Sequence, residues 1–186
     1  APACLPASAW DELDRAVAEG DYWEMLLPSI FCRTTPLLDK AAEEFGMARR
    51  DDPLSLLREL SERMFLSFEY TPRSTRVDSP IDEALLQRKG VCQDFSHIFI
   101  ALARRLGIPS RYVSGYLHHR KEDHDRSDDG ATHAWVECWL PDLGWTGIDP
   151  TNNLLAGERH IRTAIGRDYA DVPPARGVFK GAANTQ

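Results

Sequence analysis

The chain has 186 residues, of which 42% are hydrophobic and 27% charged, and this suits a globular domain with a full hydrophobic core. Its 22 lysines and arginines against 29 aspartates and glutamates give a formal net charge of −7 at pH 7, which argues against a nucleic-acid partner. No apolar run approaches the roughly 18 residues that a membrane-spanning helix needs, so we expect no contact with a membrane.

The cysteines favour reduced thiols in a cytoplasmic protein. They stand at positions 4, 32, 92 and 138, and no two have the C-x-x-C spacing of a zinc ribbon or a thioredoxin motif. A disulfide framework is not needed at this length. We therefore expect no metal and no cofactor. Because the chain begins with Ala1 and Pro2 rather than Met, we also expect a fragment or a processed product.

Helical patterns dominate the first part of the chain. Ser8 predicts a capping box that opens a short helix ending at Gly20. The apolar stretch 22–31, interrupted by Pro28, predicts a buried extended segment. Apolar periodicity with proline starts and glycine ends predicts further helices over 35–46, 52–68, 79–90 and 91–106. Gly90 is predicted to end the helix over 79–90.

After Pro109 the apolar period changes from about 3.6 to about 2, which indicates strands. Strands are predicted over 111–117, 132–140 and 145–149, with a charged loop over 118–130, and the tail from 154 is predicted to be ordered loop packed on the domain. Helices followed by antiparallel strands predict an α+β fold. We assign residues 1–186 to one domain: a helical N-terminal portion (1–50), a catalytic core (51–155) and a C-terminal tail (156–186).

Cys92 has the strongest chemical signal in the sequence. It follows Gly90 and Val91 at the start of the apolar helical pattern, one position off the apolar row. The N–H groups of a helix's first turn and the positive end of its dipole favour negative charge there, so a thiolate forms more readily. A cysteine nucleophile also needs a base within hydrogen-bond reach, and that base needs an orienting group.

His133 and Asp149 are the candidates for that base and its orienting group. A hairpin that sets them directly opposite one another would turn at Pro141, where turn-forming residues are found. Both side chains would then share a face, with Cβ atoms about 5 Å apart. A turn centred slightly later would need a bulge to keep them on one face. The spacing predicts that the helix packed under this sheet aims Cys92 at an exposed imidazole.

Four ordered motifs carry a resemblance to a known family. They are Gly90-Val91-Cys92-Gln93-Asp94-Phe95, Gly107-Ile108-Pro109-Ser110-Arg111-Tyr112-Val113-Ser114-Gly115-Tyr116, Thr132-His133-Ala134-Trp135-Val136-Glu137 and Gly144-Trp145-Thr146-Gly147-Ile148-Asp149-Pro150-Thr151. Together they resemble the transglutaminase-like core, and more narrowly its bacterial branch described as transglutaminase-like or candidate cysteine proteases. The resemblance implies a papain-like α+β core in which Cys92 is the nucleophile, His133 the base and Asp149 the orienting residue. It also implies an N-terminal β-rich domain in full-length relatives.

Other candidates have simpler interpretations. Cys4, Cys32 and Cys138 are interpreted as structural, and His97 as a satisfied buried or boundary residue. Tyr70 and the Gln93 side chain are candidates for the oxyanion site or the substrate site, and the backbone N–H of Cys92 is the favoured oxyanion donor. The charged loop has donors that could bind a metal, but it lacks EF-hand and zinc spacing, which favours solvated charges. Its donors are His118, His119, Asp123, His124, Asp125, Asp128 and Asp129.

These features predict a cysteine-dependent acyl-transfer enzyme that acts on a peptide or protein substrate. A thioester on Cys92 would pass its acyl group to water or to an amine, and the sequence leaves the choice open. The alternative is a non-catalytic interaction module that retains the fold, which the intact Cys, His and Asp set disfavours. The oligomeric state also stays open.

Overall fold

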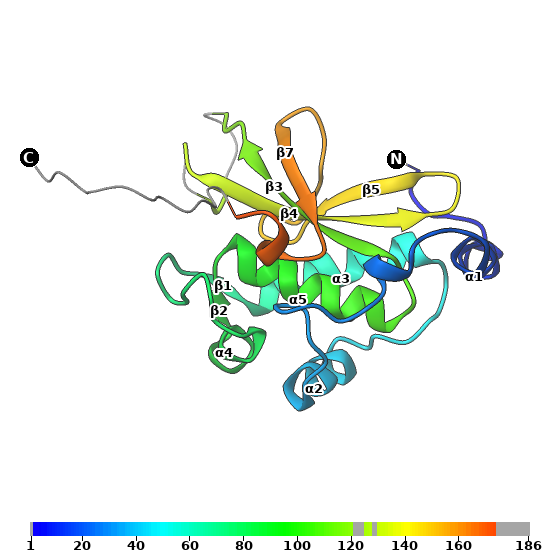
Figure 1. Cartoon of the computed structure of the whole chain (residues 1–186), viewed down its shortest axis with the longest axis horizontal. Coiled ribbons are helices and arrows are strands. Elements are labelled where there is room, and N and C mark those ends of the chain that lie inside the picture. The colour runs from blue at the N-terminus through cyan, green and yellow to red at the C-terminus, as the bar shows by residue number, and fades with distance from the viewer. Residues whose placement is uncertain (1, 121–124, 128–129, 174–186) are drawn as a thin grey trace, which may run out of the picture.

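The computed structural model describes residues 2–120, 125–127 and 130–173, and its helices lie beneath a twisted antiparallel sheet (Figure 1). The helices are α1 (Ala9–Glu19), η1 (Trp23–Met25), α2 (Pro36–Glu44), α3 (Pro53–Ser67), α4 (Ile81–Gln87), α5 (Cys92–Arg105) and η2 (Tyr169–Asp171). The strands are β1 (Glu69–Tyr70), β2 (Lys89–Gly90), β3 (Ser110–Leu117), β4 (Thr132–Leu140), β5 (Gly144–Asp149), β6 (Leu154–Leu155) and β7 (His160–Gly166). The α+β prediction is confirmed.

The sheet has five strands in the order β6-β5-β4-β3-β7, and every neighbouring pair is antiparallel. The short strands β1 and β2 form a separate parallel pair directly before α5. Strand residues alternate between faces, so Ala134, Val136 and Cys138 lie on the face of β4 that packs on α5. His133 and Trp135 consequently lie on the opposite face.

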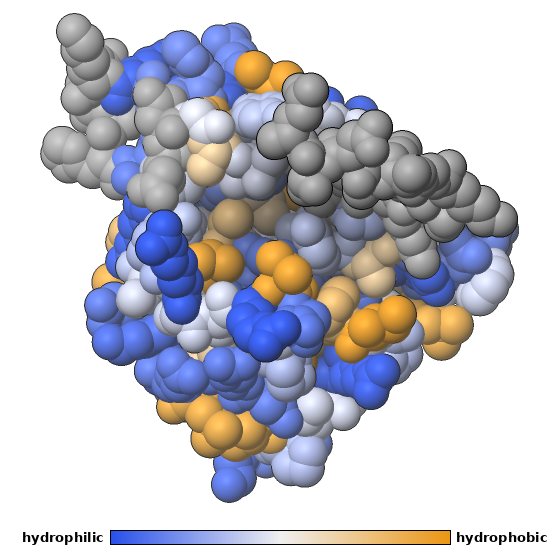
Figure 2. All heavy atoms as spheres, turned by 60° about the vertical axis from the view of Figure 1, so that its left-hand side comes forward, coloured by the Kyte–Doolittle hydropathy of each residue, from blue (hydrophilic) through white to orange (hydrophobic). Residues whose placement is uncertain are grey.

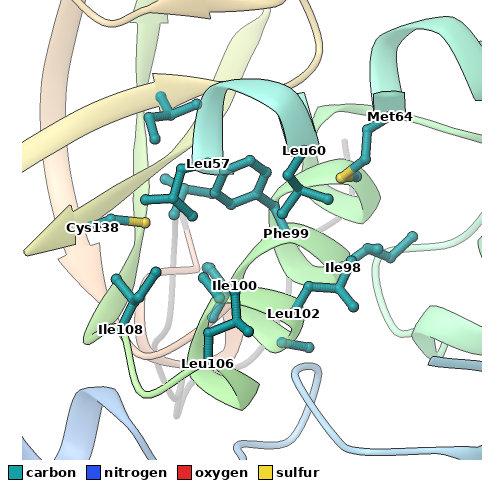
Figure 3. Packing of buried hydrophobic residues seen from close by; sticks show 14 of the residues in the cluster. Leu57, Leu60, Met64, Ile98, Phe99, Ile100, Leu102, Leu106, Ile108 and Cys138 are labelled. Atoms are coloured by element: carbon teal, nitrogen blue, oxygen red, sulfur yellow. The ribbon is translucent and has the colours of Figure 1, made fainter. Parts of the chain in front are cut away.

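Helix α5 is buried on all sides rather than along one stripe. Every residue from Gln93 to Arg104 is buried, because the sheet covers one side of the helix and α2, α3 and α4 cover the others. Figure 3 shows the Phe99 ring of α5 beside Leu57 and Leu60 of α3, in a core that also contains Ile98 and Leu102. A helix held in this way fixes the position of its first residue, Cys92.

The sheet curls so that its two edge strands approach each other. Strands β6 and β7 lie at opposite edges, yet only residues 156–159 join them. An extended stretch of that length spans about 17 Å, whereas five flat strands span about 19 Å. A register shift between Ser114 and Gly115 in the β3–β7 pair adds to the bend. The curl covers Trp135, which is 2% exposed, on the face away from α5.

Three local predictions are wrong. Segment 22–31 is not buried and extended: it contains the 3₁₀ turn η1, and Trp23, Leu27 and Ile30 are at least half exposed. Helix α4 ends at Gln87, because Arg88 takes the left-handed conformation at φ 54°, so Gly90 does not end it. The tail after 154 contains a seven-residue strand, β7, that pairs with β3.

The observed helix starts test the predicted caps. The capping box at Ser8 does not form, since its hydroxyl donates to Glu12 and makes no bond to a backbone N–H. The predicted proline starts of α2 and α3 are present, and Thr35 and Asp52 cap these helices through their side chains. In α4, Pro80 is the N-cap residue itself, and no side chain caps the helix. None of the helices in the described part of the chain combines the length and the apolar character that crossing a membrane requires.

Candidate active site

Cys92 is half-buried at the first position of α5, and the residues around it make a compact turn. The Asp94 carboxylate accepts the Val91 N–H at 2.8 Å and the Thr75 hydroxyl at 2.6 Å, which ties the helix start to the preceding loop. A Cβ on Gly90 would lie 2.9 Å from the Asp94 Cβ, so only glycine fits there. The backbone N–H groups of this first turn have no partner inside the helix.

His133 and Asp149 form a buried pair. His133 Nε2 lies 2.8 Å from Asp149 Oδ2, and the two residues are 2% and 0% exposed. The prediction of an exposed imidazole is therefore wrong. The pair lies where β4 begins and β5 ends. Figure 2 shows the face of the molecule that lies on the left in Figure 1. This surface is mostly hydrophilic, with hydrophobic side chains around a central hollow.

The hairpin register explains how the two side chains meet. The β4–β5 ladder pairs Val136 with Ile148 and Leu140 with Gly144, so the turn centres on residue 142 rather than 141. One more step of this register sets Asp149 opposite Trp135, which makes His133 its diagonal neighbour on the same face. The shared face is confirmed, and no bulge is needed.

Asp149 accepts hydrogen bonds at both carboxylate oxygens. Oδ1 takes the backbone N–H groups of Thr151 and Asn152, while Oδ2 takes His133, His160 and the Asn152 side chain. Burial is the largest single influence and by itself would raise the pKa of Asp149. The bonds from His133, His160 and Asn152 outweigh it and hold that pKa well below its ordinary value. Asp149 is therefore a fixed negative charge beneath the imidazole.

Cys92 lies close enough to His133 to influence the pKa of its imidazole. Burial alone lowers the pKa of His133, but the hydrogen bond to Asp149, the negative charge of Asp149 and the nearness of Cys92 outweigh it and raise that pKa to about 10. No well-aligned hydrogen bond joins the thiol to the ring, and Nδ1 is buried without a partner among the described residues. The site thus contains an imidazole that is bonded to a carboxylate at Nε2, is unpaired at Nδ1 and lies near a thiol.

The other residues predicted to lie at or near the site, Gln93, Tyr70 and His97, all have partners within the fold. The Gln93 amide donates to the Val77 carbonyl at 2.9 Å, so it is already engaged, and the Tyr70 ring packs edge-on against Phe95. His97 is confirmed as a buried, satisfied residue, because its Nε2 accepts the Tyr169 N–H at 3.2 Å.

The other three cysteines lie apart from His133 and Asp149. Cys32 and Cys138 are buried, and burial raises the pKa of each thiol to about 12. Cys4 is exposed.

The charged loop holds ion pairs where it is described. Asp125 binds Arg159 at 2.7 Å and His119 at 3.2 Å. Four of the loop's predicted donors, Asp123, His124, Asp128 and Asp129, lie outside the described residues.

His160 is the site residue that sequence reasoning missed. Its Nε2 lies 3.2 Å from Asp149 Oδ2, and together with His133 it forms a group whose potential ligand atoms lie within 4.8 Å of one another. Such a His₂Asp set could hold a metal ion. Here the two imidazoles hydrogen-bond to the carboxylate, and this accounts for the arrangement.

Comparison with known proteins identifies relatives of this chain. A protein of Mycobacterium leprae described as uncharacterized is 35% identical over 178 residues, which are 95% of this chain and 62% of that protein. A protein-glutamine gamma-glutamyltransferase of Pseudomonas aeruginosa is 32% identical over 152 residues, covering 71% of this chain and 21% of that one. A crystal structure from Cytophaga hutchinsonii, described as a candidate cysteine protease, matches with a TM-score of 0.68 and 31% identity.

The match to the Cytophaga structure covers 83% of this chain and 50% of that one, so the chain spans only part of the proteins it resembles. The family model for the transglutaminase-like superfamily matches residues 40–150, which contain Cys92, His133 and Asp149. The chain belongs to the transglutaminase-like superfamily.

Proposed function

We propose that the chain is a cysteine-dependent acyl-transfer enzyme in which Cys92 is the nucleophile, His133 the general acid and base, and Asp149 the residue that orients and charges His133. The observation that carries this proposal is the buried 2.8 Å bond between His133 and Asp149, with the free edge of the imidazole beside a thiol at a helix start. A structural histidine would have no need for an unpartnered nitrogen at that edge.

In the first step the Cys92 thiolate attacks the carbonyl carbon of a carboxamide or a peptide bond. A C–S bond forms, and the negative charge moves to the carbonyl oxygen. The backbone N–H of Cys92 is the favoured donor to that oxygen, because the first turn of α5 directs unpaired N–H groups outward. The proton on Nδ1 of His133 passes to the leaving nitrogen, the C–N bond breaks, and a thioester remains.

In the second step an acceptor displaces the thiolate. His133, now neutral, takes a proton from water or from a primary amine as that acceptor attacks the thioester carbon. Water gives a carboxylic acid, and an amine gives a new amide. Transfer to an amine requires a site that excludes water and holds the amine. The relatives named above include proteins described for each outcome, a candidate cysteine protease and a gamma-glutamyltransferase.

A substrate screen with matched variants tests the proposal. Glutamine-containing peptides would be incubated with the enzyme with and without a primary amine, and ammonia release, amine incorporation and peptide cleavage would be measured separately. Cys92→Ala is the variant without the nucleophile. Cys138→Ala, which removes a buried thiol away from the site, is the control for loss of a cysteine.

The proposal predicts at least one of these products in the wild-type chain and in Cys138→Ala, and none in Cys92→Ala. Ammonia release without amine incorporation supports hydrolysis, whereas incorporation supports transglutamination. Equal turnover by the wild-type chain and Cys92→Ala would overturn the assignment of the nucleophile. Binding of peptides without any turnover would favour the non-catalytic interaction module.

A further inference from the structure

His160 begins strand β7 and reaches Asp149 from the edge of the curled sheet. Its backbone lies opposite Leu117 of β3, and its side chain, 4% exposed, points to the same carboxylate oxygen that His133 contacts. The Trp135 ring packs edge-on against the imidazole with ring centroids 5.2 Å apart. The Trp135 ring and the Asp149 carboxylate therefore fix the position of the His160 side chain.

The hydrogen bonds of His160 define which nitrogen carries the proton. The Gly157 N–H donates to Nδ1 at 3.3 Å, so Nδ1 is an acceptor and bears no hydrogen. A neutral imidazole then carries its hydrogen on Nε2, which donates to Asp149 Oδ2 at 3.2 Å. Protonation of Nδ1 would place two hydrogens against each other and break the bond from Gly157. The surroundings thus favour one neutral tautomer.

Several charged groups surround this imidazole. Asp149 at the end of β5 contacts it, and His133 on β4 lies with its ring centroid 6.3 Å away. Glu137 of β4 and Arg162 of β7 line the same small cavity of about 330 Å³ and are paired with each other at 3.0 Å.

The facing residue on β3 is Leu117, which is not ionisable, and Arg159 is engaged by Asp125. Asp149 is therefore the charge to which the Nε2–H of His160 is bound directly.

We propose that His160 is a positioning residue that shares the negative charge of Asp149 and so sets the pH at which His133 gives up its imidazolium proton. This inference rests on the proposed function of Cys92, His133 and Asp149. The donor on His160 draws charge away from the side of Asp149 that faces His133. Its hydrogen also presents positive charge to the His133 ring. Both effects weaken the hold of Asp149 on the His133 proton.

Two variants separate the donor from the ring. His160→Phe keeps a flat ring of similar bulk and removes the donor, while His160→Gln keeps an N–H₂ donor on a flexible side chain. Titration of the His133 imidazole by ¹⁵N NMR in the full 186-residue chain reads the effect without any substrate. We expect His160→Phe to move the His133 midpoint to higher pH by roughly half to one unit. This is less than the roughly one to two units that a full hydrogen bond to an anion represents, because His160 acts on His133 through Asp149. His160→Gln should restore most of the wild-type midpoint.

Wild-type protein gives a second reading that does not depend on a variant folding. Its His160 resonances should show Nε2 protonated and Nδ1 unprotonated through the range in which His133 titrates. A protonated Nδ1, or a His133 midpoint that stays the same or falls in His160→Phe, would overturn the proposal. Neither NMR measurement depends on catalysis. Absence of any Cys92-dependent product would therefore overturn the proposed function but would leave the measured effect of His160 on His133 intact.

Discussion

Asp149 connects the imidazoles of His133 and His160 with the turn that follows β5. One of its oxygens accepts from His133 and His160, and the other holds the backbone of the following turn through Thr151 and Asn152. These bonds keep the carboxylate charged despite complete burial, and the charge in turn favours an imidazolium at His133. The orientation and the charge state of the His133 imidazole thus depend on one residue.

Replacing Asp149 with asparagine should reduce turnover by roughly 10² to 10⁴-fold while the chain stays folded. The amide has the same shape but no negative charge, so His133 loses both its preferred orientation and the charge that stabilises the imidazolium. The measurement is kcat on the best substrate of the screen, with circular dichroism to verify folding.

Asp14→Asn is the matched control for Asp149→Asn, because Asp14 is bound to Arg49 at the surface, where its side chain is 54% exposed. It should stay within about threefold of the wild-type rate, since surface ion pairs contribute little. A wild-type rate in Asp149→Asn would contradict the role given to its charge.

The sequence was sufficient to predict His133 and Asp149 but not His160. The first two follow from a hairpin, in which pairing is local and the turn residues limit the register to within one position. His160 contacts Asp149 only because residues 156–159 carry the chain across the curled sheet to its far edge. That crossing depends on tertiary structure, and the sequence around His160 contains no recognised motif that would indicate it.

At the scale of elements, the glycine in the middle of β3 permits the sheet to curl. A Cβ on Gly115 would lie 2.1 Å from the Ile161 carbonyl oxygen and 2.6 Å from the Trp135 ring. The strand β7 and the indole therefore both occupy space that a side chain would need. Since β7 carries His160, the closeness of these elements also positions the site.

Gly115→Ala should lower the free energy of unfolding by about 1–3 kcal/mol, because the backbone of β7 must move to make room for the methyl group. The measurement is urea unfolding followed by tryptophan fluorescence. Gly157→Ala is the matched control: nothing lies within 4 Å of the added Cβ, and the N–H that bonds His160 is retained. Equal stability of the two variants would contradict the tight packing of β7 on β3.

The elements that were predicted correctly share strong local signals. Helices α2 and α3 begin with a cap followed by proline. Successive side chains of strand β4 point to opposite faces of the sheet, and both faces are buried. Strand β7 was missed because its apolar residues Ile161 and Ile165 are 56% and 45% exposed, so its pattern does not match a core-facing strand. It is held by the backbone bonds to β3, and these leave little trace in the sequence.

At the scale of the whole molecule, His97 joins segments that are far apart in the sequence. Its ring stacks on Phe31 with centroids 5.2 Å apart, lies 5.1 Å from the Tyr112 ring of β3, and accepts the Tyr169 N–H. Burial lowers the pKa of His97 from 6.5 to about 3, so the folded chain contains the neutral ring. The N-terminal segment, α5, the sheet and η2 therefore meet at a group that resists protonation.

This histidine should make the fold sensitive to acid. Its pKa is about 3 when folded and about 6.5 when unfolded, so its contribution to stability is complete above pH 6.5 and is lost as the pH falls toward 3. Within that window the unfolded chain binds the extra proton, and the loss is about 1.4 kcal/mol for each pH unit. In His97→Gln, whose amide oxygen can still accept the Tyr169 N–H, this part of the slope should disappear.

The measurement is the free energy of unfolding from urea titrations at several pH values between 3 and 7. His118→Gln, at an exposed position, is the control for the loss of a histidine. An unchanged slope in His97→Gln would show that another group is responsible for the acid sensitivity.

The central claim is that His133 makes Cys92 reactive, and one labelling experiment tests it directly. The folded chain is treated with iodoacetamide from pH 5 to 9, and modification of each cysteine is followed by mass spectrometry. Exposed Cys4 is the internal reference, while Cys32 and Cys138 are buried and should stay unmodified. The account predicts rapid labelling of Cys92 well below pH 8.5, the ordinary range of a thiol, and its loss in His133→Ala. Labelling of Cys92 that rises together with Cys4 and is unchanged in His133→Ala would contradict it.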